Sequence, residues 1–106
     1  MTEAEAKEAA ETLGLIAQAE RASESFYRAC AEAEPDHATV WHRIADAEGN
    51  HAVWATTLAT WLMERQGDGF RIGRPFRREA ILAYVDRVRQ AEAEVRTGEL
   101  KGGSFT

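Results

Sequence analysis

Pro35 is the only proline in the first 74 residues of this 106-residue chain. A proline clashes with the preceding helical turn and disfavours helical geometry in the residue before it, so a helix that reaches Pro35 must end there. The apolar spacing on either side predicts one helix over about residues 3–33 and a second over about 36–66. Because the connection is so short, the two helices must fold back on each other as an antiparallel hairpin.

Local signals mark the ends of these helices and predict a third. Thr2 and Glu5 have the spacing of a capping box at the first N-terminus, and Gly67 is a suitable C-terminal cap for the second helix. The second proline of the chain suits the first turn of a third helix over about 75–97. The tail, 98–106, has too little apolar content to order itself and is expected to be flexible.

Composition restricts the class of protein further. Ala (20 residues) and Glu (14) dominate, which favours helices over a β-sandwich, and the net charge of −5 argues against nucleic-acid binding. The longest uncharged run, 52–63, is shorter than the roughly 20 residues of a bilayer span. The single cysteine, Cys30, excludes an internal disulfide and is expected to fill space in the core. We therefore expect an all-α, cytoplasmic protein with one domain over 1–106.

Polar residues interrupt the apolar faces of the hairpin. Glu20 lies four residues after Ile16 on the apolar face of the first helix, and Glu48 lies four after Ile44 on that of the second. His51 lies three residues after Glu48, so the two side chains project the same way. The apolar face that we predict to form the core of the second helix consists of Val40, Ile44, Ala47, His51, Ala55, Leu58 and Leu62.

The polar residues of the two helices lie at similar distances from the hairpin turn. Glu20 is 15 residues before Pro35 and Glu48 is 13 after it, so each is roughly 20 Å from the turn at about 1.5 Å per residue. A hairpin therefore brings Glu20, Glu48 and His51 together. Buried carboxylates must be neutralised, and iron, with oxygen and imidazole ligands, would supply the missing positive charge. The alternative is a hydrogen-bonded polar cluster that only sets the register of the helices.

These residues resemble the ferritin-like superfamily, and most of all a rubrerythrin or an encapsulated ferritin. The similar segments are AERASESFYRACAEAEPDH and IADAEGNHAVWATTLATWL, within roughly residues 10–66. The resemblance implies that Glu20, Glu48 and His51 bind iron in a di-iron centre, and that Tyr27 is a hydrogen-bond partner behind the ligands. It also implies ferroxidase activity, the oxidation of Fe²⁺ by O₂ or peroxide. Glu24, one turn beyond Glu20, is a weaker candidate near the metal or on its access path; the alternative is a Glu that faces solvent or an interface.

The histidine count indicates how such a centre would be completed. A full di-iron site of this kind needs four Glu and two His, and all three histidines of this chain fall between residues 37 and 51. A second chain related by a two-fold axis can provide the other half. We therefore expect a homodimer with a four-helix core, alone or as part of a larger ring. The resemblance to encapsulated ferritins adds an encapsulin shell, and hence a protein nanocompartment, as a partner to consider.

Two other functions stay open at this stage. The chain could be a helical oligomerisation or interaction module without catalysis, or it could bind and deliver a metal passively. Trp41, Trp54 and Trp61 flank the apolar face of the second helix and favour helix or subunit packing over a cofactor site. On the third helix, we expect Glu79, Glu92 and Glu94 to face solvent and not to be ligands.

Overall fold

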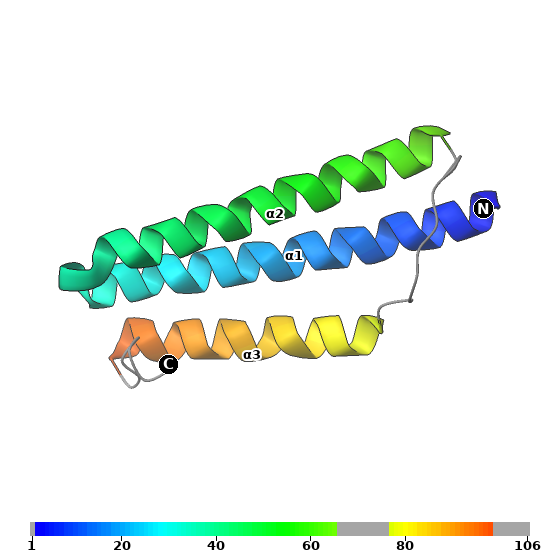
Figure 1. The fold of residues 1–106 in the computed structure, drawn as a ribbon. Helices are drawn as coiled ribbons and strands as arrows, with labels where there is room; N and C mark the ends of the chain where they lie inside the picture. Colours follow the sequence, from blue (N-terminus) through cyan, green and yellow to red (C-terminus); the bar gives the residue numbers. More distant parts are fainter. Residues whose placement is uncertain (1, 66–76, 99–106) are drawn as a thin grey trace.

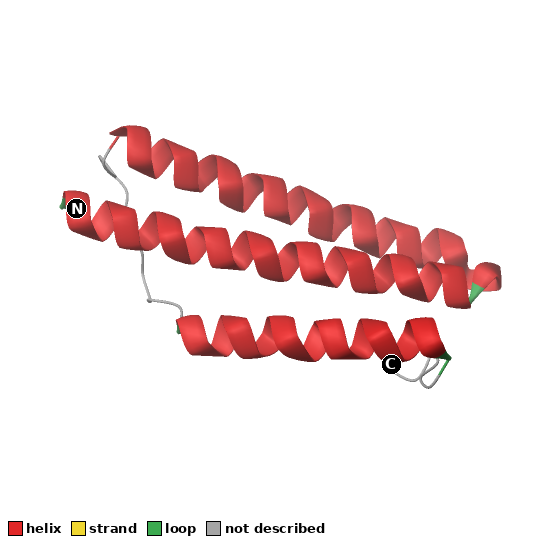
Figure 2. Ribbon diagram, turned by 180° about the vertical axis from the view of Figure 1, so that it is seen from behind, coloured by secondary structure: helices red, strands yellow, loops and turns green. Residues whose placement is uncertain are grey.

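The structure, a computed structural model, describes residues 2–65 and 77–98 of the chain. Three helices account for almost all of them: α1 (Glu3–Ala33), α2 (Ala38–Arg65) and α3 (Arg78–Thr97). Figure 2 shows the same helices from behind, with no strand in the part of the chain that the structure describes. The predicted all-α fold class is confirmed.

The N-terminal cap and the hairpin turn have the local chemistry that the sequence predicts. The Thr2 hydroxyl accepts a hydrogen bond from the Glu5 N–H (3.1 Å), and the Glu5 carboxylate accepts one from the Thr2 N–H (3.1 Å). At the other end of α1, the Glu34 N–H donates to the Cys30 carbonyl (2.9 Å). A short 3-10 turn, Pro35–His37, then replaces the first turn that was expected to be α-helical.

The third helix begins three residues later than predicted. Arg77, with an extended backbone (φ −81°, ψ 115°), is the N-cap, so α3 starts at Arg78 and not at 75. At its other end Gly98 adopts φ 81°, a left-handed conformation that glycine adopts without steric cost. The remaining predictions about helix ends concern residues outside the described ranges: Gly67, Pro75 and the tail beyond 98.

Helix α1 lies between the other two helices (Figure 1). α2 returns antiparallel to it, whereas α3 runs parallel to it on the other side. Ion pairs join α3 to α1 near both ends: Arg78 to Glu11 (3.0 Å) and Arg96 to Glu32 (3.0 Å). Between these ends, the hydroxyls of Ser23 and Tyr84 form a 2.6 Å hydrogen bond.

The core between α1 and α3 is small and close to the hairpin turn. Its buried members are Phe26, Ala29, Cys30 and Val95, with Trp41 of α2 packed against them. Cys30 is fully buried, which confirms the prediction that it fills space in the core. Because so few large side chains are buried, this single chain leaves much apolar surface in contact with water.

The predicted core face of α2 is wrong for about half of its residues. Val40 is 57 % exposed, and Ala47 and His51 are exposed as well. α2 instead packs on α1 through a neighbouring line of small residues that includes Ala45 and Ala52, both almost fully buried. Small side chains allow two helix backbones to approach closely. The spacing of apolar residues identified the apolar face of α2. It did not show which part of that face α1 would cover within one chain.

None of the helices in the described part of the chain combines the length and the apolar character that a membrane span requires.

Candidate metal centre

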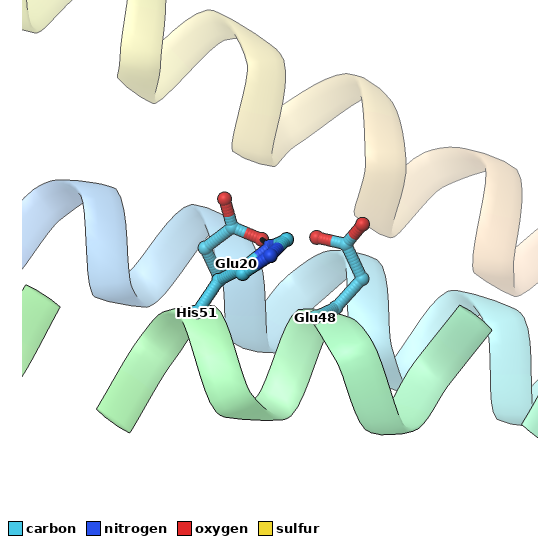
Figure 3. Close-up of side chains that lie close together, drawn as sticks. All are labelled: Glu20, Glu48 and His51. Atoms are coloured by element: carbon cyan, nitrogen blue, oxygen red, sulfur yellow. Dashed lines mark ion pairs between the residues drawn. The ribbon is translucent and has the colours of Figure 1, made fainter. Parts of the chain in front are cut away.

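Glu20 of α1 and Glu48 and His51 of α2 form one cluster midway along the hairpin. Each offers a ligand atom, and these atoms all lie within 4.8 Å of one another. Figure 3 shows the three side chains converging from the two helices. The sequence predicted that these residues meet because they lie at similar distances from the hairpin turn. The structure brings them together. Within the described residues, no other group of three or more Asp, Glu, His and Cys side chains has this geometry.

The cluster is less buried than expected. The Glu20 side chain is 25 % exposed, Glu48 is half-buried, and His51 is 62 % exposed. The expectation that His51 faces the core is therefore wrong for the single chain. Its exposure follows from the rotation of α2 about its own axis, which turns the side of the helix with Val40, Ala47 and His51 away from α1. The cluster opens to the outer surface of the hairpin.

The charges of the cluster are not balanced by protein cations. Burial, followed by the hydrogen bond and the negative charge of Glu20, raises the pKa of Glu48 to about 7. His51 Nδ1 lies 3.5 Å from Glu20 Oε2, too far for a strong hydrogen bond. This Glu20 oxygen is buried and has no hydrogen-bond partner. No Lys or Arg in the described ranges forms an ion pair with either carboxylate.

The three donors fit a metal ion. Carboxylate oxygens and an imidazole nitrogen are ligands of iron, zinc and manganese. Two ligand atoms on opposite sides of such an ion, each about 2.1 Å from it, stand about 4.2 Å apart. The observed limit of 4.8 Å is close to that value. The unpartnered Glu20 oxygen is the atom that such an ion would satisfy.

Tyr27 lies beside the cluster. Its ring stacks on Trp41, with centroids 5.9 Å apart and planes at 17°. Burial is the main cause of its raised pKa, with smaller contributions from Tyr84 and from the charge of Glu48. The Tyr27 hydroxyl does not hydrogen-bond to any of the three cluster residues, so its implied role as a hydrogen-bond partner of a ligand stays a prediction.

Glu24 lies outside the cluster. Its carboxylate accepts hydrogen bonds from Arg21 (2.8 Å) and Arg28 (3.1 Å), and that from Arg21 is the main reason why its pKa is lowered. Arg28 also forms an ion pair with Asp46 of α2 (2.9 Å). The Glu24 carboxylate also lies over Gly49, where a Cβ atom would be 2.8 Å from its Oε2. Glu24 is thus an interface residue between α1 and α2, already neutralised by arginines.

A groove that the sequence did not predict is lined by residues of all three helices. It lies over α1 between α2 and α3 and has a volume of about 550 Å³. The Trp41 indole N–H, in its wall, is buried without a hydrogen-bond partner. The third helix contributes Tyr84, and its contact with Ser23 could not have been found without knowing how α3 docks. The lining residues are Ser23, Phe26, Tyr27, Trp41, Ile44, Tyr84, Arg87, Val88 and Ala91.

The third helix adds no ligand to the cluster. Glu92 is partly buried, but it accepts hydrogen bonds from Ser25 (2.9 Å) and Arg96 (3.0 Å) and so serves to dock α3. Glu94 accepts a hydrogen bond from Gln90, and Glu79 is exposed. Of these three, Glu79 is exposed as expected, whereas Glu92 and Glu94 are partly buried.

Comparison of the chain with protein-family models, with curated proteins and with solved structures finds no match.

Proposed function

We propose that the chain binds iron at the Glu20–Glu48–His51 cluster and acts as a ferroxidase, with the di-iron centre completed by a second copy of the chain. One observation carries the proposal: two carboxyl groups share a site where no described Lys or Arg pairs with them, and one buried oxygen of Glu20 lacks a hydrogen-bond partner. A buried carboxylate without compensation is costly, and a cation removes that cost. The resemblance of the same residues to ferritin-like proteins favours iron as the cation.

The second copy is part of the proposal because one chain supplies half of a di-iron ligand set. Three side chains would leave a pair of metal ions short of ligands. His51 faces outward, and the cluster opens onto a surface with exposed apolar residues. A two-fold axis through the opening would place a second Glu–Glu–His set opposite the first, because an isologous interface repeats the same patch.

Each residue has a defined part in the proposed reaction. Two Fe²⁺ ions, the substrate, lose one electron each, and O₂ takes up both electrons and two protons to become hydrogen peroxide. The Glu20 and Glu48 carboxylates bind the iron and favour the more highly charged ferric product. Glu48 gives up its proton to solvent when iron binds. His51 supplies the nitrogen ligand, and the second copy covers the opening and so limits access of water.

The first test is the rate of Fe²⁺ oxidation in air, together with mass spectrometry of the intact assembly. We expect two irons per dimer and oxidation well above the protein-free rate. Glu48→Ala should lose both, whereas Glu64→Gln, an exposed Glu on the same helix, should retain both. Oxidation by Glu48→Ala at the wild-type rate would overturn the proposal.

The same experiment separates the other two candidate functions. A protein that binds two irons per dimer without turnover would be a passive metal carrier. A dimer that ignores iron, and that survives Glu48→Gln, would be an interaction module in which the polar cluster only sets the register.

A further inference from the structure

The groove between α2 and α3 has the size of a small-molecule site. Its volume of about 550 Å³ lies within the range of roughly 300–1,000 Å³ that ligand pockets occupy. Its lining residues on α3 run from Tyr84 to Ala91, so the groove extends for about 10 Å along the helices at about 1.5 Å per residue. None of the three cluster residues lines it, so a molecule in the groove would be held by other side chains than those of the proposed metal centre.

The walls of the groove are mostly apolar. Three aromatic rings form a row: Tyr27 stacks on Trp41 at 5.9 Å, and the Phe26 ring lies 5.3 Å from that of Tyr27, between centroids. Ile44 of α2 and Val88 of α3 add aliphatic surface. An apolar molecule that enters the groove removes this surface and its own from water, which is the main source of affinity for such ligands.

The polar groups in these walls favour a ligand that accepts hydrogen bonds. None of the described residues that line the groove is an Asp or a Glu. The hydroxyls of Ser23 and Tyr84 bind each other at 2.6 Å. The Trp41 indole N–H is a buried donor without a partner, so a polar ligand atom beside it should be an acceptor.

Arg87 supplies a positive charge at the rim. It is exposed, it is the one charged residue among those that line the groove, and it forms no ion pair within the described ranges. The side chains three and four positions away from it on α3 are uncharged: Ala83, Tyr84, Gln90 and Ala91. Arg96 of the same helix, in contrast, pairs with Glu92 and Glu32 (3.0 Å each). Arg87 is therefore available to an anion in the groove.

We propose that the groove binds a small amphipathic carboxylate, with its apolar body against Phe26 and Ile44 and its carboxylate paired with Arg87. The guanidinium group matches a carboxylate in shape and charge, and the exposed rim lets both groups keep part of their hydration. A cationic headgroup would be repelled there, and a neutral one would leave the arginine without a counter-ion. This inference goes beyond the proposed function and does not depend on it.

Three probes that share one chain and differ in headgroup test the charge preference. Octanoate is an anion, octanol is neutral, and octylamine is a cation at neutral pH. Calorimetric titrations of the full chain are made with chelator present, so that no metal offers the carboxylate a second site. Octanoate should bind with the highest affinity and octylamine with the lowest. Equal affinities for octanoate and octylamine would overturn the proposal.

A pair of arginine variants tests the ionic contact. Arg87→Gln should weaken the binding of octanoate about fivefold, the scale of one solvent-exposed ion pair, and leave that of octanol unchanged. Arg89→Gln is the matched control, because Arg89 is an exposed arginine of the same helix that does not line the groove. Equal losses in the two variants would reject a specific contact with Arg87.

A second pair tests the apolar part of the site. Ala91→Phe places a ring in the groove and should weaken octanoate and octanol alike, whereas Ala93→Phe adds the same ring at an exposed position away from the groove and should weaken neither. Circular dichroism checks that both variants keep their helices. Unchanged binding by a folded Ala91→Phe protein would contradict the proposed location.

The tryptophans report independently on where the probe binds. The chain has three of them, so NMR spectra of the nitrogen-labelled protein contain three indole N–H signals, which Trp54→Phe and Trp61→Phe assign. Octanoate should shift the signal of Trp41. A shift confined to Trp54, which is 78 % exposed, would mean that octanoate binds the open surface of α2 and would refute the site.

Two further results separate this site from the proposed metal centre and from a protein partner. Glu48→Ala should bind octanoate like the wild type while failing to oxidise Fe²⁺, so either proposal can fail without the other. The affinity for octanoate should not depend on the protein concentration. An affinity that falls as the chain dimerises would show that a second copy fills the groove, and it would reject the small-molecule site.

Discussion

The carboxyl groups of Glu20 and Glu48 offer oxygens within 4.8 Å of each other where α1 meets α2, and burial together with Glu20 raises the pKa of Glu48 to about 7. This pairing is stable only while one of the two groups is neutral, because two buried negative charges repel each other. A proton or a cation at this level therefore stabilises the hairpin.

Without metal, the stability of the protein should therefore fall as the pH rises. The folded-state pKa of Glu48, about 7, lies above the usual glutamate pKa of 4.5. A raised pKa contributes stability that is fully present below pH 4.5 and is lost as the pH rises through 7. The loss should be on the order of 1 kcal/mol, since the partly exposed site is screened by solvent. Urea unfolding at pH 5 and pH 8, with chelator present, measures it.

Glu48→Gln is the control for this pH dependence. An amide resembles the protonated carboxyl and cannot ionise, so the variant should lose the part of the pH dependence that comes from Glu48. At pH 8 it should be more stable than the metal-free wild type. A wild-type protein whose stability rises relative to the variant between pH 5 and pH 8 would show that the pKa of Glu48 is not raised.

The hydrogen bond between Ser23 and Tyr84 should hold α3 against α1. Ser23 is buried, with 3 % exposure, so Tyr84→Phe leaves its hydroxyl without this partner at a cost of about 1 kcal/mol. Ser23→Ala in the same background removes the unpaired group. A double-mutant cycle in urea should give a coupling energy of about 1 kcal/mol between the two positions. Additive effects would show that the 2.6 Å contact does not stabilise the fold.

The sequence was sufficient for the parts of the fold that depend on local chemistry. The capping box at Thr2, the helix end before Pro35 and the common level of Glu20 and Glu48 follow from residue types and from the rise per residue. The first helix has the predicted bounds, 3–33. These features need no knowledge of a third element, which is why spacing alone could predict them.

Other features depend on how helices rotate against each other, and the sequence could not predict them. The exposure of His51 follows from α2 docking through Ala45 and Ala52, and alanines are too small to stand out in an apolar pattern. The neutralisation of Glu24 requires the positions of two arginines, one helical turn away on either side. A single-chain pattern also cannot distinguish an apolar face that covers a neighbouring helix from one that meets a second copy.

The Cys30 thiol should react only when the protein unfolds. It is fully buried, and burial, with a smaller effect of Glu34, raises its pKa from 9.0 to about 11. The thiolate is the reactive form, so a two-unit shift alone slows modification about 100-fold at pH 8. A thiol reagent should modify Cys30 in the native protein at least that much more slowly than in urea. The exposed thiol of Thr39→Cys should react at the rate of a free cysteine, and equal rates at both sites would mean that Cys30 is accessible.

Substitution by alanine should stabilise the protein at only one of two glycines within helices. Nothing lies within 4 Å of a Cβ placed at Gly14, so Gly14→Ala should stabilise the protein by up to about 1 kcal/mol through helix propensity alone. At Gly49 the same Cβ would stand 2.8 Å from the Glu24 carboxylate, which Arg21 and Arg28 hold in place. Gly49→Ala should therefore lose that gain and become less stable than Gly14→Ala. Chemical denaturation measures both.

Removing the obstructing side chain tests the cause of the difference. In a Glu24→Ala background the Cβ at residue 49 meets no carboxylate, so Gly49→Ala should regain most of the helix-propensity benefit. The arginines that pair with Glu24 are partly exposed to solvent, and loss of these ion pairs should cost at most about 1 kcal/mol. If Gly49→Ala stabilises the wild-type background as much as Gly14→Ala does, then Glu24 moves aside freely, and its arginine contacts do not fix the approach of α2 to α1.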